Sequence, residues 1–260
     1  MGLMLSSMIA FPSPTWGWAR GWVFASSRVM LSGLQSQSVL YVSDKPEDEG
    51  KVLLDPNALS KDGTKLYGLL EGAIYKDDGQ MESADGHTAV RIIEFDVAAK
   101  KWTGRSWLYL FEDKGVSIGD FNMLDDTTAL VIERDSGAGT KDKACADPKQ
   151  PKPDCFEAPA ELKRVYKIEF NDANAGKAVR KIGYIDLLNI QDPDNKKKAG
   201  AKDGVYDMPF VTIENVDRVD ATHIIIGNDN NLPFSAGRTV DKADNNEFSL
   251  LEVGEFLNAK

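Results

Sequence analysis

An internal repeat constrains the fold of this chain more than any other feature of its sequence. Residues 123–135 and 218–230 align without a gap at a spacing of 95 residues, and residues 59–71 form a weaker third copy. Each copy reads as a strand, an acidic turn, an apolar strand and then polar or acidic residues. After residue 44, short β-rich runs bounded by Gly, Asp, Asn and Pro take the place of helical periodicity. The repeat therefore predicts an all-β fold built from similar sheets.

The arrangement of these runs predicts a β-propeller. A further strand with alternating charged and apolar residues follows each copy, in residues 91–95, 164–170 and 247–251. Units of about four strands that recur every few tens of residues are typical of propeller blades. The sequence contains about three such units, whereas a closed propeller has roughly four to eight. We expect a partial propeller of about three antiparallel four-stranded blades, with open sheet edges through which chains can associate.

The acidic residues divide the chain into two parts. All 41 of them lie from Asp44 onward, and the preceding segment contains Trp16, Trp18 and Trp22. This composition predicts an atypical N-terminal segment over residues 1–43 and a partial propeller over residues 44–260. The first segment can be interpreted as a degenerate leader, a surface segment or the product of a misplaced start site.

The N-terminal segment does not have the pattern of an export signal or of a membrane span. No Lys or Arg precedes the apolar stretch at residues 4–11, so a secretory signal is poorly matched. No run reaches the ~18 apolar residues that a spanning helix needs. We expect no transmembrane segment.

The net charge of −10 excludes one class of partner. Binding to a nucleic-acid backbone needs clustered Lys and Arg, so we expect no nucleic-acid partner. An acidic surface is compatible with binding hard cations, and equally with solubility alone.

The two cysteines lie together in a polar loop. Cys145 and Cys155 flank three prolines, and no His or further Cys is nearby to complete a zinc site. A disulfide across this loop would fit an oxidising compartment. The alternative is two free thiols in a cytosolic protein.

Several motifs resemble the phytase-like family described as having esterase-like activity. They are residues 60–72, 118–135, 163–170, 226–238 and 245–251, and the resemblance covers roughly residues 50–255, matching the C-terminal part of that family. The family's N-terminal blades are not recognisable here. The resemblance implies an exported bacterial protein, periplasmic or secreted, that acts on a small phosphorylated molecule.

The repeat also indicates where a site would lie. Strand ends converge near the channel of a propeller, so the residues after each apolar strand are candidates for one rim. Carboxylate and amide oxygens suit a divalent metal, above all Ca²⁺. Arg134 and Arg238 offer guanidinium forks for phosphate, and with Asp229 they form the predicted catalytic set. The predicted metal ligands are Glu71, Glu133, Asp135, Asn228, Asp229 and Asn230.

Structural roles for the same residues stay open. Asn and Asp favour turns because they tolerate left-handed conformations, and Glu133 with Arg134 could form an ion pair between blades. Only two histidines occur, and no G-x-S-x-G motif is present, which argues against a Ser-His-Asp esterase. Together with these candidate residues, the family resemblance implies a metal-assisted phosphoesterase. The alternatives are a non-catalytic propeller that binds a ligand or a protein, and an inactive truncated fragment.

Overall fold

The structure is a computed structural model in which two compact units are distinguished, Met1–Thr64 and Lys65–Lys260. It describes residues 64–75, 79–149, 154–194, 196, 200–232 and 234–260, and the backbone of four strands before residue 55. The two units are described separately.

The first unit contains a four-stranded antiparallel sheet. Its strands are β1 (Ser6–Phe11), β2 (Val23–Arg28), β3 (Val39–Ser43) and β4 (Lys51–Leu54), and each pairs with the next along the chain. β3 and β4 pair across the composition boundary at residue 43. No strand was predicted in the segment before this boundary, although the run at 39–42 is rich in residues that favour strands.

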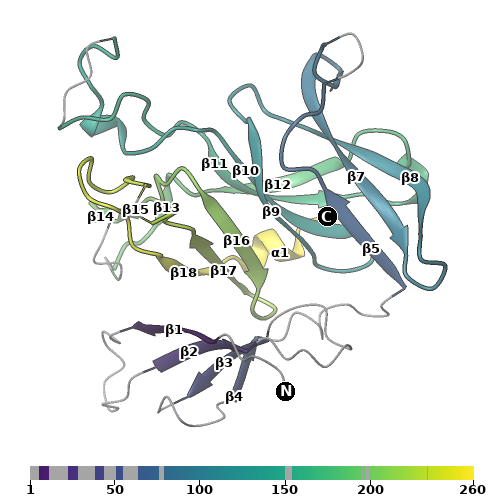
Figure 1. Ribbon diagram of the computed structural model, residues 1–260, viewed down its shortest axis with the longest axis horizontal. Helices are drawn as coiled ribbons and strands as arrows, with labels where there is room; N and C mark the ends of the chain where they lie inside the picture. Colours follow the sequence, from purple (N-terminus) through teal and green to yellow (C-terminus); the bar gives the residue numbers. More distant parts are fainter. Residues whose placement is uncertain are drawn as a thin grey trace. The chain divides into compact units, whose positions relative to one another are not determined.

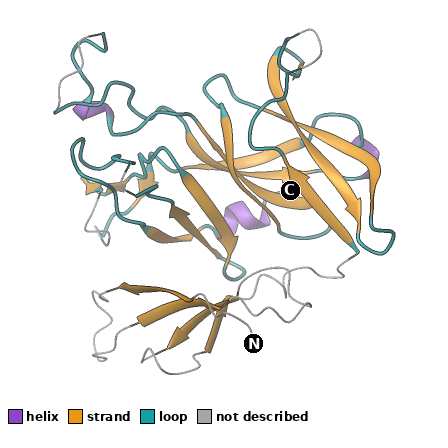
Figure 2. Ribbon diagram, in the orientation of Figure 1, coloured by secondary structure: helices purple, strands orange, loops and turns teal. Residues whose placement is uncertain are grey.

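The second unit contains three large antiparallel sheets (Figures 1 and 2). Sheet I comprises β5 (Lys65–Leu69), β6 (Ser83–Ala84), β7 (His87–Asp96) and β8 (Lys101–Leu110). Sheet II comprises β9 (Ser117–Met123), β10 (Thr128–Arg134), β11 (Lys163–Glu169) and β12 (Arg180–Asp186). Sheet III comprises β16 (Ile213–Arg218), β17 (His223–Asn228) and β18 (Phe248–Glu252).

Smaller elements connect these sheets. β13 (Ile190–Gln191), β14 (Ala201–Lys202) and β15 (Val205–Tyr206) form a short sheet between sheets II and III in the sequence. Helical structure in the described residues is limited to two 3₁₀ turns, Lys141–Lys143 and Asp172–Asn174, and to α1 (Gly254–Asn258). The prediction of an all-β, partial propeller is confirmed. No helix of the described residues is long and apolar enough to cross a membrane.

The repeat has a physical basis in two matching turns. Asp125, between β9 and β10, accepts hydrogen bonds from the backbone N–H groups of Thr127 and Thr128, both at 2.9 Å. Asp220, between β16 and β17, accepts the equivalent bonds from Thr222 at 2.7 Å and His223 at 2.8 Å. Asp125 and Asp220 are 95 residues apart, which is the spacing of the repeat. An aspartate that bonds to the backbone two residues ahead fixes a tight turn, so the acidic position of the motif is structural.

The alternation of β10 explains how the sheets stack. Ala129 and Val131 belong to a buried cluster shared with sheet I, which includes Trp107 and Tyr109. Leu130 and Ile132, one residue out of phase, belong to a second buried cluster with sheet III. Successive side chains of a strand point to opposite faces, so one apolar strand can serve two cores. Sheet II is therefore packed on both faces, as an inner blade of a propeller is.

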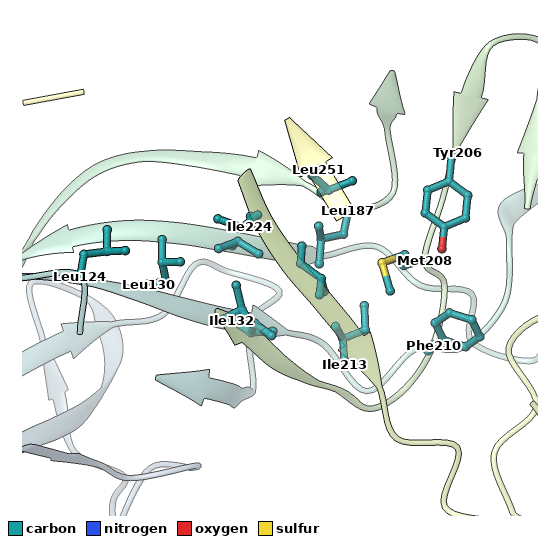
Figure 3. Packing of buried hydrophobic residues seen from close by; sticks show 13 residues of the cluster. Leu124, Leu130, Ile132, Leu187, Tyr206, Met208, Phe210, Ile213, Ile224 and Leu251 are labelled. Atoms are coloured by element: carbon teal, nitrogen blue, oxygen red, sulfur yellow. The ribbon is translucent and has the colours of Figure 1, made fainter. Parts of the chain in front are cut away.

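Three residues of the connection before β16 complete the second core. Tyr206, Met208 and Phe210 are fully buried and lie beside Ile213 and Leu187 in Figure 3. Burial of such large side chains contributes about 1.5 to 3 kcal/mol each, so this connection helps to hold sheets II and III together.

The predicted disulfide is confirmed. The sulfur atoms of Cys145 and Cys155 are 2.01 Å apart, and the described part of the chain contains no free cysteine. Backbone hydrogen bonds of 2.9 Å join Cys145 and Lys143 to Phe156 on the other side of the loop. From this loop, Lys143 Nζ donates to the carbonyl oxygen of Arg238 at 2.8 Å. The bridged loop thus braces the insertion between β17 and β18.

Candidate functional site

An open cleft lies where the three sheets meet. Its volume is about 410 Å³, and it is lined by Leu69 at the end of β5 and Glu71 after it, by residues 118–121 of β9 and by Glu214 of β16. The backbone N–H of Ile118 donates to the carbonyl oxygen of Glu71 at 2.7 Å, which joins sheets I and II at this point. Each of the three sheets therefore supplies residues to one cleft, as expected where propeller blades converge.

A glycine allows β9 and β16 to approach each other here. A side chain at Gly119 would collide with the carbonyl oxygen of Ile213, the first residue of β16. The missing Cβ of glycine is what permits such close contact between two backbones. The same contact brings Glu214, the next residue along β16, to the cleft.

Arg134 connects all three sheets beside this cleft. It ends β10, and its side chain is only 8% exposed. Its Nη2 lies 3.4 Å from Oε1 of Glu71 and 3.5 Å from Oε1 of Glu214. Its Nε is buried and has no hydrogen-bond partner among the described residues. Most buried donors in proteins have a partner, so this unpaired guanidinium N–H beside the cleft calls for an explanation, such as a bound water, ion or ligand.

Negative charge exceeds positive charge around Arg134. Burial raises the pKa of Glu214, and the charges of Asp229 and Glu71 raise it further, while Arg134 opposes this shift. Sequence reasoning identified Glu71, Arg134 and Asp229 but missed Glu214. Its only signal was a charged residue within the β-rich run at 211–219, which does not reveal that this run borders a cleft.

Asp120 also lines the cleft and was missed as a candidate. Its Oδ2 accepts hydrogen bonds of 2.8 Å from the backbone N–H of Val216 and from Nδ2 of Asn122, and its Oδ1 accepts from Phe121 N at 2.8 Å. It thereby connects β9 to β16. Burial raises the pKa of Asp120 to about 6, although these hydrogen bonds act in the opposite direction.

The raised pKa of Asp120 predicts a dependence of stability on pH. Its folded-state pKa lies above that of the unfolded chain, so folding favours the protonated form. This contribution is fully present below about pH 4 and is lost as the pH rises through about 6. In Asp120→Asn the group no longer titrates. As the pH rises from 4 to 7, we expect the unfolding free energy of the variant to increase by about 1 to 3 kcal/mol relative to that of the wild type. Urea unfolding of both proteins at each pH measures this gain, and a constant difference would contradict the assignment.

Glu133 lies in a buried network away from Arg134's partners. It has no exposed surface, and it accepts hydrogen bonds from Tyr109 Oη at 2.6 Å, from Glu112 N at 2.7 Å and from Lys181 Nζ at 2.9 Å. Lys181 also lies over the ring of Tyr166, 4.1 Å from its centre. Glu133 thus joins sheet II to sheet I through a satisfied polar network.

Asp135 has a comparable structural position. Its carboxylate accepts hydrogen bonds from the backbone N–H groups of Glu161 at 2.6 Å and Leu162 at 3.0 Å, and it lies 2.7 Å from Nζ of Lys163. Burial lowers the pKa of Lys163 to about 8, and Asp135 opposes this shift. Asp135 fixes the chain where the long insertion returns to β11.

Arg238 is held by several partners outside the cleft. Its Nε and Nη2 donate to the carboxylate of Glu247 at 3.0 and 2.8 Å, and its Nη1 donates to Asp207 at 2.6 Å. The guanidinium also stacks over Tyr206 and Phe210, 5.3 and 4.8 Å from the ring centres. Most of its donors are therefore already used within the fold.

The Asn-Asp-Asn stretch forms the start of an ordered loop. Nδ2 of Asn228 donates to the carbonyl oxygen of Asn245 at 3.1 Å, and Nδ2 of Asn230 donates to that of Asp244 at 2.9 Å. Oδ1 of Asp229 accepts from the backbone N–H of Asn231 at 2.9 Å. The amide side chains thus tie the loop to itself, as in the turn alternative, while Asp229 also acts on Glu214 through its charge.

The predicted metal ligands take part in several separate hydrogen-bond networks. In the part of the chain that the structure describes, no group of three or more His, Cys, Asp or Glu side chains is arranged to hold a metal ion. Glu133 and Asp135 are bound by lysines of two separate networks. The oxygen donors suit a hard cation in chemistry. The calcium site stays a prediction.

A comparison with known protein families identifies the class of the chain. The family model described as "Phytase-like: Esterase-like activity of phytase" matches residues 58–232, well over half of the sequence. The chain therefore belongs to the phytase-like family. The match includes β5 to β17 and with them every residue that lines the cleft.

Proposed function

We propose that this protein is a phosphoester hydrolase that holds the phosphoryl group of a small molecule at Arg134. The observation that carries the proposal is the guanidinium of Arg134, which is buried beside an open cleft and whose Nε has no partner among the described residues. A guanidinium binds phosphate through two parallel N–H groups, and Nε with Nη2 forms such a pair. Membership of the phytase-like family supports phosphate esters as the substrate class.

The carboxylates around Arg134 supply the remaining chemistry of the proposal. Glu214 is close to the guanidinium, and its raised pKa brings it nearer to the value that suits a general base at neutral pH. In this role it removes a proton from a water molecule that attacks phosphorus, and the ester oxygen leaves with a proton from solvent. Asp229 contributes by raising the pKa of Glu214. A divalent cation such as Ca²⁺ supplies charge neutralisation of phosphate when one is bound, and no step here depends on it.

Arg134→Lys tests this function. Lysine keeps the charge but loses the paired N–H groups, so we expect kcat/KM for a phosphate ester to fall roughly tenfold to a hundredfold. The matched control is Arg180→Lys, because Arg180 pairs with Glu169 on sheet II, and neither residue lines the cleft. Hydrolysis of p-nitrophenyl phosphate, with and without added Ca²⁺, provides the measurement. Equal activity of the two variants, or no hydrolysis by the wild type, would refute the proposal.

A non-catalytic binding function is the second candidate. It is favoured by the structural partners of Glu133, Asp135 and Arg238, which leave few of the predicted site residues at the cleft. This function predicts phosphate binding without turnover. The exposed Phe248 and Leu250 of β18, the last strand of sheet III, would then serve association through a sheet edge.

We also propose that the protein acts in the periplasm or outside the cell. The disulfide between Cys145 and Cys155 supports this location, because such bonds persist in oxidising compartments.

A further inference from the structure

We propose that Glu71 is an internal competitor for the phosphate position on Arg134, and that a bound phosphoryl group displaces it. The inference rests on the proposed function and assigns Glu71 a role in setting the affinity of that site. It follows from the unequal environments of the two carboxylates that share Arg134.

Two carboxylates share one nitrogen of Arg134. Glu71 and Glu214 both face Nη2, at 3.4 and 3.5 Å, which is long for a charge-assisted hydrogen bond. Nε, the second donor on that edge of the guanidinium, has no partner among the described residues. A buried donor without a partner destabilises the protein, because its lost hydration is not replaced by a hydrogen bond. A ligand that engages Nε and Nη2 together would remove this cost, and a tetrahedral oxyanion has the two oxygens to do so.

The two carboxylates differ in how easily they can leave. The side chain of Glu71 is 72% exposed, whereas that of Glu214 is 33% exposed. Glu214 belongs to β16 of sheet III, while Glu71 lies two residues beyond the end of β5. An exposed ion pair contributes little to stability, so turning the Glu71 carboxylate into solvent costs little free energy. Glu71 is therefore the group that yields to phosphate.

The backbone of Glu71 stays in place when its side chain moves. Its carbonyl oxygen accepts the hydrogen bond from Ile118 that joins sheets I and II. Displacement therefore needs a rotation of the side chain and no rearrangement of the sheets. Removing the charge of Glu71 should leave the fold intact and make the Arg134 position easier to fill.

The test measures binding of inorganic phosphate by calorimetry at fixed ionic strength. We expect Glu71→Gln to bind phosphate about three to ten times more tightly than the wild type, because a competing and repelling charge is gone. Glu252→Gln is the matched control, since it makes the same change of charge at an exposed position on β18. It should bind phosphate as the wild type does. Arg134→Lys should weaken binding in either background.

The outcomes separate this inference from the proposed function. If Arg134→Lys weakens phosphate binding but Glu71→Gln leaves it unchanged or weaker, Glu71 is not a competitor and the function stands. If Glu252→Gln tightens binding as much as Glu71→Gln, the effect is one of net charge and the inference is overturned. If phosphate binding is absent, or does not depend on Arg134, both the inference and the proposed function are wrong.

Discussion

Replacing Arg238 with methionine is expected to lower the free energy of unfolding by about 3 to 5 kcal/mol, because it leaves two partly buried carboxylates unpaired. Arg238 donates to Glu247 through two nitrogens and to Asp207 through a third. Its Nη2 also donates to the carbonyl oxygen of Asp207 at 2.7 Å. Methionine preserves the apolar contact with Tyr206 and Phe210 but satisfies none of these acceptors.

Denaturant unfolding of Arg238→Met measures the effect, with Arg218→Met as its control. Arg218 is exposed on β16, so we expect its replacement to change stability by about 0.5 kcal/mol or less. Phosphate binding by Arg238→Met should persist under native conditions, since Arg238 lies outside the cleft. A stable variant that has lost phosphate binding would instead return Arg238 to the catalytic role that the sequence predicted.

Glu133→Ala is expected to destabilise the fold by a similar amount, about 3 to 5 kcal/mol. The change removes a fully buried carboxylate and leaves Lys181 and the hydroxyl of Tyr109 without their shared acceptor. It also opens a cavity between sheets I and II. The increase in the unfolding rate, measured together with the equilibrium change, reports the loss of this contact between blades.

The control for Glu133→Ala is Glu157→Ala, which removes the same carboxylate from an exposed position just after the bridged loop. Its effect should be within about 0.5 kcal/mol of zero. If both variants unfold alike, the buried network contributes nothing to stability and the structural interpretation of Glu133 is wrong.

The fold could be predicted from the sequence because its repeat carries both the turns and the core. Asp125 and Asp220 fix equivalent turns, and the apolar run at 129–132 alternates between two cores. These turns and this alternation can be recognised in the sequence alone, because they do not depend on which distant residues each strand contacts. The strands β1 to β4 were not predicted, because no copy of the repeat extends before residue 59.

The site could be predicted only in part, because adjacent residues of a strand end face different surroundings. Glu133 turns to a buried network with sheet I, Arg134 turns to the cleft, and Asp135 meets the strand that returns after the insertion. Alignment of the repeats predicts that all three residues lie at the same end of the strand. It does not predict the direction in which each side chain points. Glu214 was not predicted, because its strand becomes part of the cleft only through the close contact at Gly119.

The partners of Arg238 were equally hidden in the sequence. Asp207 and Glu247 lie 31 and 9 residues from it, in two irregular segments whose paths no periodic pattern fixes. In the sequence, Arg238 has the features of a phosphate-binding residue. In the structure, its guanidinium binds two carboxylates of the same chain and stabilises the fold. Propensity and motif spacing do not distinguish these two uses.

The central claim is that the Nε–Nη2 edge of Arg134 binds phosphate, and NMR of arginine side chains tests it most directly. In a phosphate titration, the Nε–H resonance of Arg134, assigned as the signal missing from Arg134→Lys, should shift and saturate. The Nε–H resonance of Arg238, which already donates to Glu247, should stay in place. A titration that leaves the Arg134 resonance unchanged while phosphate binds, or that shifts the Arg238 resonance instead, would contradict the account.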